Sequence, residues 1–252
     1  MDFILTERNG AKATIRLNRG KANTLNQQMI NELSAALTEV ENDAEIQAVI
    51  LTGHGEFFTA GLDVIELYDY NEEQIYTFWK SFSGVIEQIA RFPKLVICAV
   101  TGHSPAGGCV LAIGADYRVM AQGKYRIGLN EIPVGIVIPQ SIFHLYKFWL
   151  GDRRAYQYLL EGKLYTADEA AQVGLVDVVC ELDQVEAQAA AIADKLLKFD
   201  QTVWQMSKAN LRADMLKVFD LDFDLTYGPI IKQWWNPGAR AAMGALVASL
   251  KK

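Results

Sequence analysis

The sequence predicts an α/β protein with a helical region at its C-terminal end. Short apolar runs and segments with helical spacing alternate up to about Pro139, as in a core of strands joined by crossover helices. Beyond Pro139 helical patterns dominate, and no low-complexity linker interrupts the chain. We therefore expect an α/β core over residues 1–197 and a helical region over residues 198–252 that packs tightly against it.

Each element of the predicted core follows from a local pattern. Met29, Leu33 and Leu37 recur at helical spacing, whereas residues 95–100 form a continuous apolar run, which suits a strand buried on both faces. Pro93 ends the helix before that strand. In chain order we expect a strand at 13–17, a helix at 26–40, a strand at 48–51, a helix at 72–91, a strand at 95–100, a helix at 109–114 and a strand at 117–120.

The second part of the chain is predicted to be mainly helical. One strand, residues 175–179, interrupts the helical patterns, and Trp234 to Pro237 mark a break within the last of them. The helices expected before residue 200 lie at 140–150, 152–161, 167–173 and 182–199.

The composition excludes several classes of protein. The net charge is −6 and the pI is near 5.2, which argues against a nucleic-acid partner. No uncharged apolar run approaches the roughly 18 residues of a membrane span, and the charged start is unlike a signal or transit peptide. Cys98, Cys109 and Cys180 are far apart and suit neither a zinc site nor a disulfide framework. We expect a cytoplasmic protein with no metal site.

In two loops the backbone, rather than the side chains, is the candidate for ligand binding. Residues 57–63 follow one predicted strand, and residues 101–109 join another strand to an apolar helix. Gly107 and Gly108 let the chain approach a ligand at that helix start, where unpaired N–H groups favour negative charge. Two N–H groups from separate loops would make an oxyanion hole suited to a thioester enolate. The alternative is that the glycines only permit tight packing.

A third segment contains a carboxylate in apolar surroundings. Glu131 lies between Leu129 and Ile132 and is followed by Pro133 and Gly135. Burial there would raise its pKa and make it an effective proton acceptor. The alternative is an exposed loop glutamate.

Taken together, the three segments resemble the crotonase (enoyl-CoA hydratase/isomerase) family. Members carry an Ala-Gly-x-Asp loop after a strand, a glycine-rich turn into a helix, and a Glu segment followed by Pro and Gly, in that order. Residues 60–63, 104–109 and 131–135 match these motifs, and residues 167–176 resemble the family's later Ala-x-Glu-Ala…Gly-Leu-Val region. The resemblance implies a crotonase-type ββα spiral core with a C-terminal helical trimerisation region.

Within the family the chain resembles the mitochondrial-type Δ3,Δ2-enoyl-CoA isomerases, which share its motifs at 104–109, 116–118 and 127–131. The resemblance implies that Glu131 is the catalytic acid/base and that the N–H groups of Ala60 and Gly107 form the oxyanion hole. The residues that it places against the substrate are Lys21, Ala22, Leu62, Asp63, Gly108 and Val110. It implies no cofactor, since CoA enters as part of the substrate.

Val110 separates two reactions of the family. Hydratases use two carboxylates, and one of them lies where this chain has Val110, which can neither bind a proton nor orient water. Isomerisation of 3-enoyl-CoA to trans-2-enoyl-CoA, a step of fatty acid β-oxidation, needs one base and an oxyanion hole. We therefore expect an isomerase. The alternatives are an enoyl-CoA hydratase or other acyl-CoA enzyme of this fold, and a non-catalytic acyl-CoA-binding protein.

The resemblance also implies an assembly, a homotrimer or a dimer of trimers. The candidates for binding the CoA phosphates are the basic residues of the C-terminal region, Lys208, Arg212, Arg240, Lys251 and Lys252. The alternative is that these basic residues lie on a solvated face of a helix and bind no phosphate. His103, in the glycine-rich turn, is a weaker candidate for contact with substrate.

Overall fold

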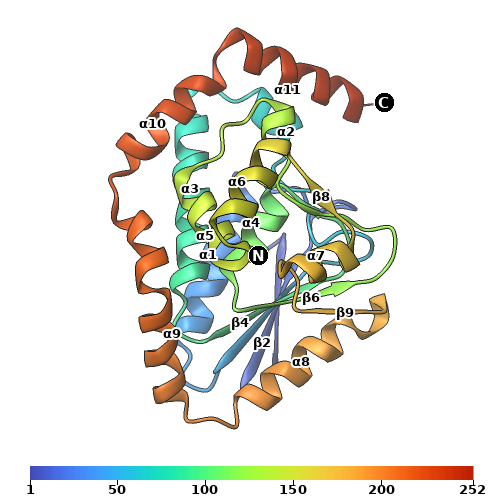
Figure 1. Cartoon of the computed structure of the whole chain (residues 1–252), viewed down its shortest axis with the longest axis vertical. Coiled ribbons are helices and arrows are strands. Elements are labelled where there is room, and N and C mark those ends of the chain that lie inside the picture. The colour runs from blue at the N-terminus through green and yellow to red at the C-terminus, as the bar shows by residue number, and fades with distance from the viewer. Residues whose placement is uncertain (252) are drawn as a thin grey trace.

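A six-stranded sheet forms the centre of the computed structural model, which describes residues 1–251 (Figure 1). Its strand order is β1-β2-β3-β4-β6-β9; β1 runs antiparallel to β2, and the other neighbours are parallel. The strands are β1 (Ile4–Asn9), β2 (Lys12–Leu17), β3 (Ala48–Thr52), β4 (Leu95–Val100), β6 (Tyr117–Ala121) and β9 (Val178–Cys180). The alternation of strands and helices therefore gives the parallel core that it predicted.

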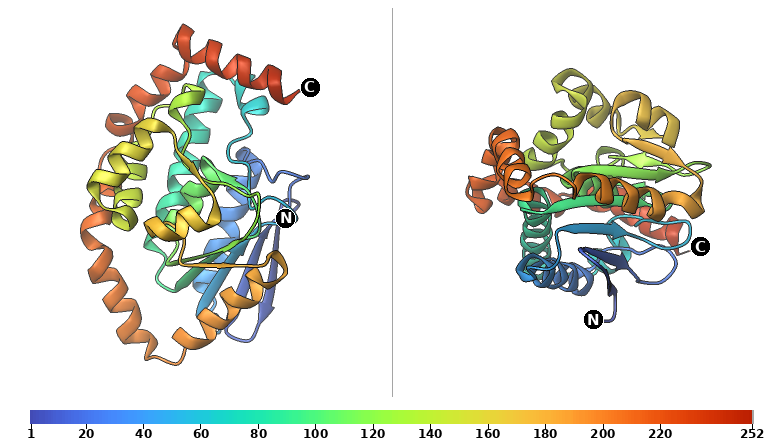
Figure 2. Two further views of the ribbon diagram at one scale, coloured as in Figure 1. Left: turned by 45° about the vertical axis from the view of Figure 1, so that its right-hand side comes forward. Right: turned by 90° about the horizontal axis from the view of Figure 1, so that it is seen from below.

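Helices cover this sheet and bury its apolar side chains. The helix α1 (Gln27–Asn42) packs on β1 and β2 and on α3 (Glu72–Arg91), while α8 (Val185–Leu196), preceded by η2 (Leu182–Gln184), packs on β3, β4 and β6. The two views of Figure 2 show these layers. Asn26 caps α1 and Asn71 caps α3, each accepting a hydrogen bond from a backbone N–H of the first turn.

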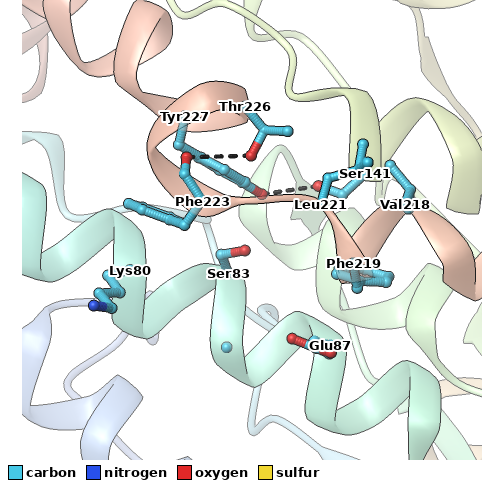
Figure 3. Close-up of a pocket in the computed structure, with 11 residues that line it drawn as sticks. Lys80, Ser83, Glu87, Ser141, Val218, Phe219, Leu221, Phe223, Thr226 and Tyr227 are labelled. Atoms are coloured by element: carbon cyan, nitrogen blue, oxygen red, sulfur yellow. Dashed lines mark hydrogen bonds between the residues drawn. The ribbon is translucent and has the colours of Figure 1, made fainter.

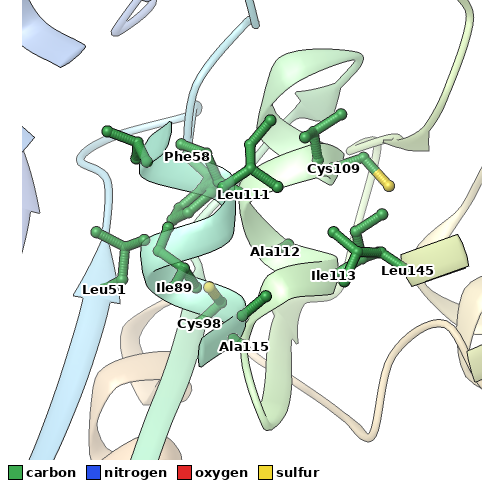
Figure 4. Close-up of a cluster of buried hydrophobic side chains, with 14 of the residues drawn as sticks. Leu51, Phe58, Ile89, Cys98, Cys109, Leu111, Ala112, Ile113, Ala115 and Leu145 are labelled. Carbon is green, nitrogen blue, oxygen red and sulfur yellow. The ribbon is translucent and has the colours of Figure 1, made fainter. Parts of the chain in front are cut away.

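The short helix α4 (Gly107–Gly114) is buried along its whole length. Leu111, Ile113 and Cys109 of this helix lie among side chains of β3, β4, α3 and α5 (Gln140–Leu150), as Figure 4 shows. A helix that is apolar on all sides belongs inside a core. Its N-terminus is therefore held rigidly at the end of the sheet.

A second, three-stranded sheet was not predicted from the sequence. It consists of β5 (Ser104–Pro105), β7 (Ile127–Gly128) and β8 (Leu164–Tyr165). Gly128 has φ +146, and a Cβ atom there would lie 2.3 Å from the Lys163 carbonyl oxygen, so only glycine fits. This sheet brings residues 127–131 beside the glycine-rich loop.

The C-terminal helices run along the outside of the core (Figure 1). They are α9 (Gln201–Leu216), η3 (Lys217–Asp220), α10 (Phe223–Trp234) and α11 (Pro237–Leu250). The last, α11, packs on α2 (Val64–Tyr68) and on η1 (Ile132–Val134), which follow the first loop and Glu131 respectively. The boundary at residue 197 stays a prediction.

Two basic residues predicted as phosphate-binding candidates have another role. Lys208 Nζ lies 2.7 Å from Asp116 Oδ2, and Arg212 lies 3.0 Å from Asp116 Oδ1; all three side chains are buried. Arg212 also donates to the backbone carbonyls of Ala90 and Gly114. These charges attach α9 to the core. Neither phosphate binding nor the alternative, a solvated helix face, therefore describes these two buried residues.

The predicted elements agree closely with the structure in the middle of the chain. The bounds of α3, β4, α5, α6 (Asp152–Glu161) and α7 (Ala167–Val173) are those expected. The strand expected at 175–179 is instead β9, because Gly174 (φ +83) ends α7 and Leu175 N–H bonds back to the Ala170 carbonyl. Among the residues described, no helix is long and apolar enough to cross a membrane.

Candidate active site

The two predicted loops lie side by side because β3 and β4 are adjacent parallel strands and end at the same edge of the sheet. The Phe58 N–H donates to the His103 carbonyl at 3.0 Å, and the His103 N–H donates to the Glu56 carbonyl at 2.8 Å. These two hydrogen bonds join the loops directly.

Glycines permit this close approach of two backbones. A Cβ atom at Gly102 would lie 2.1 Å from the Glu56 carbonyl, and one at Gly53 would lie 2.4 Å from the Phe57 carbonyl oxygen. Gly108 similarly faces the Thr59 carbonyl, at 2.7 Å from the position of a Cβ atom. Tight packing is therefore part of the reason for these glycines.

The donors of the first loop differ from those expected. The Ala60 N–H, predicted to be an oxyanion donor, donates to the Ala22 carbonyl at 2.8 Å and is not free. The Gly61 N–H donates to Thr59 Oγ1 at 3.0 Å. Within the described residues the next amide, that of Leu62, has no acceptor in hydrogen-bonding geometry. The structure therefore corrects the donor from Ala60 to Leu62.

The second loop contains Gly107, the other predicted donor. Gly107 is the first residue of α4, and its N–H finds no acceptor in the part of the chain that is described. Ala106 before it has φ +46, an uncommon value for a residue with a Cβ, and is held by a 2.8 Å hydrogen bond to the Gly128 carbonyl. A Cβ atom at Gly61 would lie only 3.1 Å from the Gly107 nitrogen, so the two loops meet at this point.

Glu131 is buried, which excludes the alternative of an exposed loop residue. Only 6% of it is accessible, and among the described residues Oε2 has no hydrogen-bond partner. Burial raises the pKa of Glu131 to about 7, and one backbone hydrogen bond opposes this shift. Its carbonyl accepts hydrogen bonds from the Val134 and Ile136 N–H groups, which fix the turn around it.

The surroundings of Glu131 are apolar or weakly polar. Its charge helps to raise the pKa values of Cys109 and Tyr146, after the larger effect of burial, so both side chains lie nearby. No second acidic group contributes to the shift of the Glu131 pKa. Val110 is buried in α4 next to Cys109. Among the described residues, no partner carboxylate therefore affects the pKa of Glu131.

An apolar groove lies beside η1, the turn that follows Glu131 in the chain, although Glu131 itself does not line it. It has a volume of about 480 Å³, and Ile132, Val137, Tyr156 and Leu160 on its walls are exposed. The other lining residues are Gly135, Ile136, Ile138, Phe143, Leu159 and Gln233. A smaller cavity of about 240 Å³ lies between α3 and α10, and Figure 3 shows the Ser141–Tyr227 hydrogen bond in its wall. That cavity includes none of the predicted site residues.

The remaining predicted residues lie around the first loop. Lys21 is exposed, and Ala22 is half-buried with its carbonyl bound to Ala60. Asp63 caps α2; burial opposes the ionised form, but hydrogen bonds from the Glu66 N–H and Arg19 lower its pKa. A role for Lys21 or Ala22 in substrate binding stays a prediction.

Two further candidates have structural contacts. His103 accepts a hydrogen bond from the Arg126 N–H through Nδ1 and packs against the Phe57 and Tyr125 rings. Arg240 donates to the Tyr68 carbonyl at 2.9 Å and stacks on that ring.

Comparison with known proteins supports a common architecture. Residues 7–225 match the family model described as enoyl-CoA hydratase/isomerase. Mouse mitochondrial enoyl-CoA delta isomerase 1 is 36% identical over 212 residues, covering 83% of this chain and 73% of that protein. The short-chain-enoyl-CoA hydratase of Clostridium acetobutylicum is 32% identical over 217 residues, covering 85% and 83%.

Solved structures agree with these matches. The crystal structure of human mitochondrial Δ3-Δ2-enoyl-CoA isomerase superposes with a TM-score of 0.95 at 27% identity, covering 99% of this chain and 98% of that one. The enoyl-CoA hydratase of Bacillus anthracis gives a TM-score of 0.80 at 27% identity, with coverage of 95% and 90%. The overall similarity is therefore greater to the isomerase structure.

Proposed function

Because this chain belongs to the enoyl-CoA hydratase/isomerase family, we propose that it moves the double bond of 3-enoyl-CoA esters to give trans-2-enoyl-CoA. The observation that carries the proposal is Glu131, a buried carboxylate with an unpartnered oxygen and a pKa near 7, close to two loops with free N–H groups. Such a group is matched to accepting and returning a proton near neutral pH.

Each chemical step has a group to perform it. The thioester oxygen accepts hydrogen bonds from the Leu62 and Gly107 N–H groups, which makes the C2 proton more acidic. Glu131 removes that proton, and the dienolate oxygen is stabilised by the same two donors at the positive end of α4. The Glu131 carboxylic acid then returns the proton at C4. No metal or cofactor takes part in this scheme, and CoA is a portion of the substrate.

Val110 favours isomerisation over hydration. Water addition needs a second group to orient and deprotonate water, and a buried valine beside the site excludes water instead. Because several relatives are enoyl-CoA hydratases, hydration is the second candidate reaction. A protein that only binds acyl-CoA is the third, and it would have no need of a glutamate with a raised pKa.

We propose that the apolar groove beside η1 holds the acyl chain. Its volume of about 480 Å³ is within the range of small-molecule sites, and its walls from η1 and α6 are apolar. We propose that Lys21, an exposed residue next to Ala22, contacts the CoA portion. With Lys208 and Arg212 used in the core, the phosphates require other cations.

We propose in addition that the protein assembles as a homotrimer through its C-terminal helices. Val203, Met206 and Leu211 of α9 are each more than 60% exposed, and such a row of large apolar side chains favours contact with another chain. A cytoplasmic location stays a prediction; the isomerase 1 relatives in mouse, rat and human are mitochondrial.

The proposal is tested by offering purified protein 3-hexenoyl-CoA and, separately, crotonyl-CoA. The ultraviolet band of the conjugated thioester should rise with the first substrate and stay unchanged with the second. Loss of the band with crotonyl-CoA would establish hydration despite Val110. No change with either substrate, combined with tight binding of both, would leave the binding protein as the correct reading.

A further inference from the structure

The free N–H of Leu62 is held in place by a segment from another part of the chain, residues 19–25 between β2 and α1. The Leu25 N–H donates to the Gly61 carbonyl at 2.8 Å, and the Leu25 carbonyl accepts from the Asp63 N–H at 2.9 Å. Leu25 therefore binds the peptides on both sides of Leu62, and the Leu62 N–H faces away from it.

Asn23 of this segment is fully buried, with no accessible surface, and has φ +50. Its side-chain Nδ2 donates to the carbonyls of Phe57 at 3.3 Å and Phe58 at 3.2 Å, and its Oδ1 accepts from the Arg19 N–H at 2.8 Å. The amide nitrogen therefore binds the first loop, while the amide oxygen binds Arg19 of the same segment as Asn23.

Those contacts reach the second loop as well. The Phe57 carbonyl accepts from Asn23, and the N–H of the same peptide unit, that of Phe58, donates to the His103 carbonyl. One peptide therefore connects Asn23 to the loop that ends in Gly107. A shift of this peptide would change the separation of the two oxyanion donors.

The side-chain amide, rather than the positive φ, explains why position 23 is an asparagine. Glycine adopts positive φ without strain, as Gly20 does three residues earlier at φ +56. Asparagine at φ +50 is less favourable than glycine, so its presence needs a second reason. The hydrogen bonds to Phe57 and Phe58 supply it.

We propose that Asn23 is a positioning residue of the oxyanion hole: its side-chain amide fixes the first loop so that the Leu62 and Gly107 N–H groups converge on one oxygen. The inference rests on the proposed isomerase function. It concerns a residue that touches neither the substrate nor Glu131.

The variant Asn23→Gly removes the amide and keeps the positive φ accessible. We expect kcat for 3-hexenoyl-CoA to fall about tenfold or more while KM changes less than about threefold, because the lost interaction acts mainly on the transition state. A second readout uses 2,4-hexadienoyl-CoA, an unreactive conjugated thioester. Its absorption should shift to longer wavelength on the wild-type protein, and this shift should shrink in the variant.

The control is Asp200→Ala, which removes a helix-capping hydrogen bond at the start of α9, away from both loops. It should lose about 1 kcal/mol of stability and leave both the turnover and the spectral shift unchanged. Asn23→Asp, which turns a negative oxygen toward two carbonyls, should act in the same direction as Asn23→Gly.

The outcomes are distinguishable. An undiminished spectral shift in Asn23→Gly, whatever happens to kcat, would overturn the positioning role and leave Asn23 with a stabilising role only. A wild-type protein that shifts the dienoyl band but turns over no 3-hexenoyl-CoA would contradict the proposed reaction, and Asn23 would still be judged by the band. A wild-type protein that turns over 3-hexenoyl-CoA without any shift would overturn the positioning role alone, and one with neither turnover nor shift would overturn both.

Discussion

Two buried carboxylates in this protein, Glu131 and Asp116, have opposite surroundings. Asp116 accepts hydrogen bonds from Lys208 and the Val96 N–H and lies 3.0 Å from Arg212, so its charge is fully compensated. Glu131 has no cationic partner, and one of its oxygens has no hydrogen-bond donor among the described residues. The difference teaches that burial alone does not identify a reactive group. What matters is whether the ionised form is stabilised.

The hydrogen bonds and ion pairs of Asp116 join α9 to the core and make this carboxylate structural. Lack of compensation leaves Glu131 balanced between two states near neutral pH, since burial raises its pKa to about 7. A proton shuttle needs both states to be accessible. The two carboxylates therefore differ in role because they differ in hydrogen-bond and ion-pair partners, although both are buried. Substituting each of them in turn tests this contrast.

The largest effect is expected from Glu131→Gln. Loss of the proton acceptor should reduce kcat by about 10³-fold or more, near the upper part of the range for general acid–base groups. Binding of an unreactive acyl-CoA should be retained, because glutamine has the same shape. The measurement is turnover of 3-hexenoyl-CoA beside equilibrium binding of the product. Glu73→Gln, an exposed residue of α3, is the matched control and should keep full activity; retained turnover in Glu131→Gln would remove Glu131 from the mechanism.

Asp116→Asn should act on stability instead. Removing the carboxylate leaves Lys208 and Arg212 buried without a counter-charge, which costs about 3–5 kcal/mol for such pairs. Denaturant unfolding monitored by tryptophan fluorescence measures the change. The activity of the fraction that remains folded should be close to that of the wild type. A stable Asp116→Asn protein with low turnover would mean that the two carboxylates are not separated in role as we infer.

The pH dependence should report Glu131. The base must be ionised, so kcat/KM should be constant above about pH 7 and fall about tenfold per pH unit below it. Ionisation of Glu131 should also change the free energy of unfolding, but in the opposite direction: stability falls as the pH rises, whereas kcat/KM increases. Because burial raises the pKa of Glu131 from its ordinary value of 4.5 to about 7 in the folded protein, the stability contributed by neutral Glu131 is present below pH 4.5 and is lost as the pH rises through about 7. Glu131→Gln should abolish this component, and a kcat/KM profile that is flat from pH 5 to 8 would contradict it.

Apolar periodicity was sufficient to predict the parallel core, and the apolar neighbours of Glu131 indicated that it could be buried, because both are local signals. The small second sheet was not predicted, and the catalytic role of Glu131 stays a prediction. The sequence was insufficient for the oxyanion donor. Whether the amide of Ala60 or of Leu62 is free depends on Ala22 and Leu25, which lie far away in the chain and contact the loop only in the folded protein. The same holds for Lys208 and Arg212, whose partner Asp116 is about 90 residues distant. A pattern of charges on a helix does not tell which of its faces is buried.

A third buried carboxylate can be created next to Glu131 with Val110→Glu. Like charges in one apolar site oppose joint ionisation, so the pKa of Glu131 should rise and the midpoint of the kcat/KM profile should move above about pH 7. Val110→Gln has nearly the same size without the charge, and its midpoint should stay at the wild-type value. If the two variants give the same midpoint, position 110 is too far from Glu131 for a second carboxylate to cooperate with it. The absence of a hydratase glutamate there would then say nothing about the choice of reaction. A midpoint that moves only in Val110→Glu, together with slow loss of the crotonyl-CoA band, would establish that this one buried position separates hydration from isomerisation in this protein.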